Sequence, residues 1–299
     1  NKAVNLSTSG ADISGTANLD AVDIDGAVQI DATLSVGVND TGYDVKFFGA
    51  TASRHMTWDE SADSLIISGD LDVNDGTIKL DGNYPVGTGN VALGDAALDD
   101  GSLSGGYNTA IGRNTLTVNT SGQENTALGN SAQSGNTTGS YNSVVGSNAL
   151  KENTSGSYNS AVGHSALLSN TTASNNTAVG YQAGYSTTTS GLMTAVGSRA
   201  AYSNTTGARI TALGYQAAYS NTTGTNNVAI GANISGYTGT LGSNTTGNYN
   251  VAMGDSALNS NTTASSNTAI GYGALLFNTT ASNNTAVGFQ AAYSNTTGT

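Results

Sequence analysis

A repeated five-residue phrase constrains this chain more than any other feature. It occurs first at Asn90–Gly94 (NVALG) and last at Asn284–Gly288 (NTAVG). The glycines that close the phrase stand at positions 94, 112, 129, 146, 163, 180, 197, 214, 231, 254, 271 and 288, so the usual period is 17 residues, with insertions of one and six residues. A fixed short period predicts a solenoid, in which each coil contacts mainly its neighbours. We expect twelve coils in residues 90–299.

The phrase has the period-two pattern of a β-strand. Its third residue is alanine in every copy but one, which has Val144, and its fourth is always a larger aliphatic residue. Because both faces of such a strand are apolar, we expect both faces to be buried. The fourth positions form the predicted core ladder: Leu93, Ile111, Leu128, Val145, Val162, Val179, Val196, Leu213, Ile230, Met253, Ile270 and Val287.

A second short segment and a turn complete each unit. The segment follows the closing glycine, as in Tyr181–Tyr185 (YQAGY), and the turn phrase has the form of Asn204–Gly207 (NTTG). Asparagine and glycine are turn residues because they tolerate left-handed backbone conformations. Two short strands and two turns per unit predict an all-β, parallel β-solenoid.

The apolar content of each unit predicts an oligomer. A unit carries about six apolar side chains, mostly alanine and valine, and the chain has no cysteine with which to form a disulfide or a thiolate metal site. Small scaffolds without such staples are stabilised by association. With one strand apolar on both faces, three chains around a common axis are the simplest arrangement, so we predict a homotrimer.

The charge divides the chain into two parts. Residues 1–100 carry 17 acidic and four basic residues, whereas residues 101–299 carry three and four. Acidic and aliphatic residues alternate in Leu19–Asp31, as in strands with one solvated face. We predict an acidic β-shaft at 1–41, a small aromatic β module at 42–70, a short shaft and linker at 71–89, and the solenoid at 90–299.

The solenoid sequence resembles two families. The glycine-terminated phrases of residues 90–299 resemble the head repeat of trimeric autotransporter adhesins of the YadA type, although the period here is 17 and that family's is nearer 14. Arrays of the form NTAVGYQAxYSNTTG also resemble those of bacteriophage tail fibres and other virion appendages. The first resemblance implies a trimeric parallel β-roll with the hydrophobic phrase facing inward.

Composition and spacing argue against several functions. The formal charge of −12 argues against a nucleic-acid partner, and no apolar run is long enough for membrane insertion. His55 and His164 are far apart in sequence, and the adjacent Asp59 and Glu60 would point to opposite faces of a strand. The solenoid adds only Glu124, Glu152 and Asp255 as acids. We expect no enzyme activity, no catalytic residues, no cofactor and no metal.

Three binding alternatives stay open. Aromatic residues form a candidate glycan-stacking stripe, for which stacking between neighbouring coils is the simpler explanation. Threonines at the second phrase position, such as Thr177 and Thr194, are typical of ice-binding solenoids but recur irregularly, and Asp70–Gly76 only partly matches a calcium loop. The stripe consists of Tyr181, Tyr215, Tyr272 and Phe289 after the glycine, and of Tyr185, Tyr202, Tyr219 and Tyr293 four residues later.

The sequence favours a structural function. We predict a homotrimeric fibre segment of a virus (phage) appendage that acts as a rigid spacer in host attachment, located in the virion or at a cell surface, with other appendage proteins and a host glycan or protein as partners. The alternatives are a bacterial trimeric surface adhesin and a sugar- or ice-binding solenoid. The last residues, 295–299, lie within a repeat, so we expect the natural polypeptide to continue.

Overall fold

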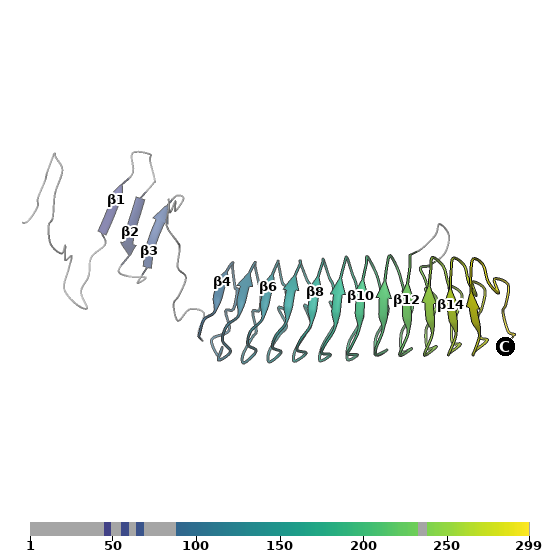
Figure 1. The fold of residues 1–299 in the computed structure, drawn as a ribbon. Helices are drawn as coiled ribbons and strands as arrows, with labels where there is room; N and C mark the ends of the chain where they lie inside the picture. The colour runs from purple at the N-terminus through teal and green to yellow at the C-terminus, as the bar shows by residue number, and fades with distance from the viewer. Residues whose placement is uncertain (1–44, 49–54, 60–63, 69–87, 233–237, 299) are drawn as a thin grey trace, which may run out of the picture. The chain divides into compact units, whose positions relative to one another are not determined.

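The computed structural model describes residues 45–48, 55–59, 64–68, 88–232 and 238–298. The chain forms two units, residues 1–78 and 79–299. All regular elements in the described residues are β-strands, so the all-β prediction is confirmed (Figure 1). The acidic shaft predicted for residues 1–41 and nearly all of the linker predicted for 71–89 lie outside the described residues.

The first unit contains a three-stranded antiparallel sheet in the order β1-β2-β3. The strands are β1 (Val45–Phe48), β2 (His55–Asp59) and β3 (Ser64–Ser68). On the central strand, Thr57 is buried, whereas its neighbour Met56 is exposed, as the alternation of a strand requires. These strands fall within the segment for which a small β module is predicted.

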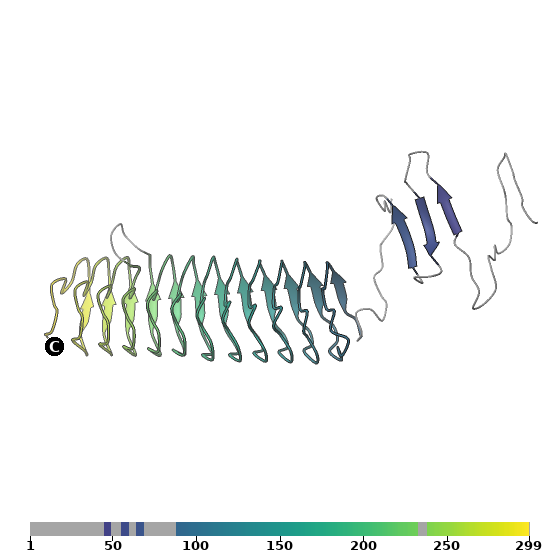
Figure 2. The same cartoon turned by 180° about the vertical axis from the view of Figure 1, so that it is seen from behind.

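The second unit is a parallel β-solenoid, as predicted. Twelve strands, one for each copy of the phrase, pair in sequence order into one sheet (Figures 1 and 2). They are β4 (Val91–Leu93), β5 (Thr109–Ile111), β6 (Thr126–Leu128), β7 (Ser143–Val145), β8 (Ser160–Val162), β9 (Thr177–Val179), β10 (Thr194–Val196), β11 (Thr211–Leu213), β12 (Val228–Ile230), β13 (Val251–Met253), β14 (Thr268–Ile270) and β15 (Thr285–Val287).

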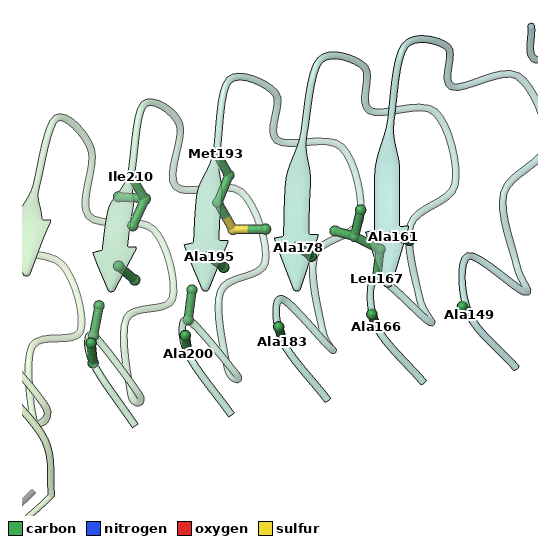
Figure 3. Close-up of a cluster of buried hydrophobic side chains, with 14 of the residues drawn as sticks. Ala149, Ala161, Ala166, Leu167, Ala178, Ala183, Met193, Ala195, Ala200 and Ile210 are labelled. Carbon is green, nitrogen blue, oxygen red and sulfur yellow. The ribbon is translucent and has the colours of Figure 1, made fainter. Parts of the chain in front are cut away.

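Equivalent residues of successive coils lie side by side. Ala178 pairs with Ala195, and Ala195 with Ala212, and the one-residue and six-residue insertions leave the register unchanged. Every phrase alanine from Ala110 to Ala269 is completely buried, and Val144 replaces it in one coil. The sheet therefore presents a continuous row of small side chains to the interior (Figure 3).

The closing glycine lets neighbouring coils approach closely. Gly146 has a φ of 136°, and a Cβ atom built on it would lie 2.7 Å from the carbonyl carbon of Gly163 in the next coil. Side chains rarely adopt this backbone conformation, and the space for one is absent. Both constraints explain why each copy of the phrase ends in glycine.

The segment after the glycine is not the second strand that the sequence predicted. It forms turns in which alternate residues have positive φ, for example Ser165 at 56° and Leu167 at 51°. In a strand, the adjacent Ala166 and Leu167 would point to opposite faces, but here both are completely buried. Hydrogen bonds between coils hold this conformation: the Leu150 amide donates to Ala166 O at 2.9 Å and the Leu167 amide to Ala183 O at 3.0 Å.

Two rows of buried asparagines fill the rest of the interior. One row is the first residue of the phrase, as in Asn142, and the other is the first residue of the turn phrase, as in Asn153. Asn153 Nδ2 donates to Asn136 Oδ1 of the preceding coil at 2.8 Å and to Gly156 O at 3.0 Å. Gly156 O also accepts from Asn142 Nδ2 at 3.0 Å, so the two rows meet at the turn carbonyls. We call them the phrase ladder and the turn ladder.

Candidate functional surfaces

The predicted core ladder lies on the outer face of the solenoid sheet. Val179 is 37% exposed and Leu128 is 44% exposed, whereas the residue between the two outward positions is buried in every coil but the first. Because side chains alternate along a strand, alanine fills the narrow interior and the second and fourth phrase residues point outward. Within one chain the ladder is therefore not a core, and a core between chains stays a prediction.

The exposure of this aliphatic ladder is continuous along the sheet. Ile111, Leu213 and Ile230 are half-buried, and the other members are exposed: Leu93, Leu128, Val145, Val162, Val179, Val196, Met253, Ile270 and Val287. Beside it runs the row of second phrase residues, which are threonine, serine or valine. The two rows form a strip that carries no charged side chain.

The predicted aromatic stripe consists of rings stacked from coil to coil. Tyr202 stacks on Tyr185 at 5.1 Å and on Tyr219 at 5.2 Å between ring centroids. Both faces of the Tyr202 ring are covered, so neither can stack on a sugar. Stacking between coils, the simpler of the two explanations, accounts for these three residues.

Four of the other five stripe residues also contact rings of neighbouring coils, whereas Tyr215 is exposed. Tyr181 stacks on His164 at 5.6 Å and has the Arg199 guanidinium 5.7 Å from its ring centroid. Tyr272 stacks on Phe289 at 5.2 Å, and Tyr293 meets Phe277 edge to face at 5.0 Å.

A second row of aromatic residues was not predicted. It occupies the position just before the first asparagine of the phrase and contains Tyr107, Tyr141, Tyr158 and Tyr249, all exposed. Tyr141 and Tyr158 stack at 4.9 Å with an interplanar angle of 5°. The signal in the sequence is their spacing of 17 residues, or 34 from Tyr107 to Tyr141. We call this row the corner row.

The potential N-glycosylation sequons are interior residues. Asn136, Asn153 and Asn221 of the Asn-Thr-Thr or Asn-Thr-Ser phrases are completely buried, and their amide nitrogens donate within the turn ladder. A glycan on such a nitrogen would have to displace the ladder. The sequence predicts these asparagines as turn formers. In the structure they also fill the interior.

The ionisable groups of the solenoid are scattered. His164 Nδ1 lies 3.0 Å from Ser165 Oγ, and Asp255 Oδ1 accepts from the Ala232 amide at 2.9 Å. The hydroxyl and amide of Ser102 both donate to Asp100 and lower the pKa of this exposed carboxyl. Across residues 88–232 and 238–298 and the three short strands, no three acidic or histidine side chains gather where they could hold a metal ion. Asp70–Gly76 lies outside the described residues.

The part of the chain that the structure describes contains no helix able to span a membrane. Comparison with known proteins gave no matching family model, no matching curated protein and no matching solved structure.

Proposed function

We propose that this chain is a structural segment of a homotrimeric fibre, of the kind found in phage appendages, and that it acts as a rigid spacer in host attachment. The observation that carries the proposal is the aliphatic ladder, exposed along the whole length of the solenoid sheet. Soluble monomers rarely expose a continuous apolar surface of this extent, and such surfaces mark sites of association.

The repeat geometry favours identical chains as the covering partner. The ladder recurs in register from β4 to β15, so a matching partner surface must repeat with the same coil spacing, about 4.8 Å. A second copy of the same sheet has that spacing along its whole length. Three copies around one axis form a closed assembly that covers all three ladders and leaves none exposed.

The internal bonding of the coils suits a spacer. Successive coils bond through strand pairs and through turn amides such as that of Thr137, which donates to Thr154 O at 2.9 Å. Most coils are also joined through the asparagine ladders. Few of these contacts are ionic: Arg113 and Asp95, for example, approach to 3.7 Å in an exposed pair. Exposed pairs contribute little to stability, so the cohesion of the rod should persist at high salt.

The mass in solution tests the trimer. Light scattering of the purified chain should give about three times 29.7 kDa. Val179→Asp would place an unpaired charge in each ladder contact and should dissociate the trimer at micromolar concentration. Thr138→Asp adds the same charge at an exposed turn and serves as the matched control. A monomeric parent chain, or a Val179→Asp variant with unchanged mass, would refute the proposal.

Localisation separates the phage fibre from a bacterial surface adhesin. Antibodies raised against the solenoid should label appendages of virus particles in electron micrographs. Labelling of the bacterial cell surface alone would favour the adhesin, with the same trimeric rod.

A further inference from the structure

We propose that the corner row forms a binding slot for a small quaternary ammonium group, with Tyr107 and Tyr141 as its walls and Glu124 between them. The three residues are equivalent positions of successive coils. The Glu124 amide donates to Gly106 O at 3.0 Å, and the Tyr141 amide donates to Gln123 O at 3.0 Å. Their φ angles are 60° for Tyr107, 54° for Glu124 and 59° for Tyr141, so their side chains leave the backbone in the same direction.

The outer side of each tyrosine is already covered. Tyr141 stacks on Tyr158, and Tyr107 lies over Gly89, where a Cβ atom would come within 2.9 Å of its ring. This leaves the ring sides that face each other across the Glu124 coil. Gln123 Nε2 contacts Tyr141 Oη at 3.4 Å and restrains that ring. A surface hollow is lined by Tyr107 and Glu124.

The width of the slot suits a group of the size of a trimethylammonium cation. Tyr107 and Tyr141 are two coils apart, which is about 9.6 Å at the usual strand spacing of about 4.8 Å. A cation midway between the rings lies about 4.8 Å from each, within the ~6 Å range of a cation–π contact with both.

The chemistry of the slot agrees with its width. Glu124 is exposed and occupies the same corner position in the coil between the two tyrosines, so it supplies a negative charge at the slot. A methylated ammonium fits this combination of two aromatic faces and one negative charge. None of these residues is an outward-facing strand residue that the proposed trimer would cover, so this inference does not rest on that proposal.

Saturation-transfer difference NMR with choline chloride tests the slot on the full chain. We expect transfer to the trimethylammonium protons and none to the neutral isostere in which carbon replaces nitrogen. Glu124→Gln, which keeps the size of an exposed side chain, and Tyr107→Leu should each weaken binding about fivefold or more. Tyr249→Leu is the matched control. The same corner position of the two neighbouring coils holds Asn226 and Ser266, so Tyr249 has no second ring to form a slot with, and binding should be unchanged.

The cation is supplied both as free choline and as the head group of phosphatidylcholine vesicles, with phosphatidylglycerol vesicles as the control. Binding to either choline form supports the slot and identifies its source. Absence of binding to both forms, equal binding of the neutral isostere, or undiminished binding by folded Glu124→Gln would overturn the proposal. Light scattering reports the trimer separately, so failure of one proposal does not imply failure of the other.

Discussion

Two stretches of the solenoid fill the same interior in different ways. In the coils from Asn108 to Ala173 both asparagine ladders are unbroken. In the coils from Gly184 to Ile210, the phrase ladder is replaced by Met193 and Ile210, and Thr187 interrupts the turn ladder. All three replacements are buried. We call these the polar stretch and the apolar stretch.

Interior volume is conserved between the two stretches. In three of the four coils of the polar stretch, a leucine stands four residues after the closing glycine and the next phrase begins with asparagine, as with Leu167 and Asn176. Gln133 takes the place of the leucine in the fourth coil. Where that phrase begins with Met193 or Ile210, the earlier residue shrinks to Gly184 or Ala201. A Cβ atom on Gly184 would lie 2.5 Å from Met193 Cε. A larger side chain in one position therefore requires a smaller one in the other.

Hydrogen bonding is compensated only in part. Gly207 O accepts from Asn204 Nδ2, and the Ser190 hydroxyl supplies a second donor at the place where Met193 has none. By contrast, Asn170 Oδ1 has no hydrogen-bond partner, because Thr187 stands where the next donor of the turn ladder would be. The apolar stretch thus exchanges hydrogen bonds for packing and leaves one buried acceptor unsatisfied.

The largest effect should come from the contact that both stretches share. Gly146→Ala should lower the free energy of unfolding by about 4 kcal/mol, since it combines positive-φ strain with a clash against Gly163. Gly288→Ala has the same strain, at a φ of 131°, but its Cβ atom would meet only Ala291 at 3.9 Å, so we expect about 2 kcal/mol. Urea unfolding measures both, and equal losses would show that the contact between coils contributes nothing.

A substitution in the polar stretch tests whether the turn ladder is needed for stability. Asn153→Leu introduces an apolar side chain without the compensating changes of the apolar stretch. It removes the donor to Asn136 Oδ1 and one donor to Gly156 O, and should cost about 3 kcal/mol in urea unfolding. Thr154→Val removes an exposed hydrogen bond to Thr171 O and should change stability by less than about 0.5 kcal/mol. A tolerated Asn153→Leu would mean that the ladder is dispensable.

A double-mutant cycle tests whether the side-chain volumes at positions 184 and 193 are coupled. Gly184→Leu alone overpacks Met193, and Met193→Asn alone opens a cavity beside Gly184. Together they recreate the Leu167 and Asn176 pairing, so the double variant should be more stable than the sum of the single losses by about 2 kcal/mol. Thermal unfolding of the four proteins gives this coupling. Additive losses would show that the two positions are independent.

The sequence alone predicted the parts of the coil that depend on the period-two pattern of the phrase and on its closing glycine. The strand at Thr177–Val179, Gly180 at its end and the in-register sheet all follow from the repeated phrase. The left-handed conformation of Leu167 does not, because it is unfavourable locally and is held by hydrogen bonds to the next coil. Asn153 was explained by turn chemistry alone, since burial of an amide becomes favourable only when equivalent amides of neighbouring coils satisfy it.

The candidate surfaces also divide into features that the sequence predicts and features that only the fold reveals. The aliphatic ladder was found by its period, but the sequence did not show which side of the sheet it occupies, because both sides are apolar in the phrase. The corner row was missed because its members, such as Tyr107 and Tyr249, are separated by unrelated residues at the same position. Only their left-handed backbone, which sends the side chains outward at one corner, makes them a surface feature.

The turn ladder also gives the rod a direction. Asn136 donates to Asn119, Asn153 to Asn136 and Asn170 to Asn153, so every amide dipole points the same way along the stack. Within this row the dipoles add, as they do in an α-helix, so the row itself is positive at the end nearer Asn119. This polarity runs along the stack in side chains that never reach the solvent.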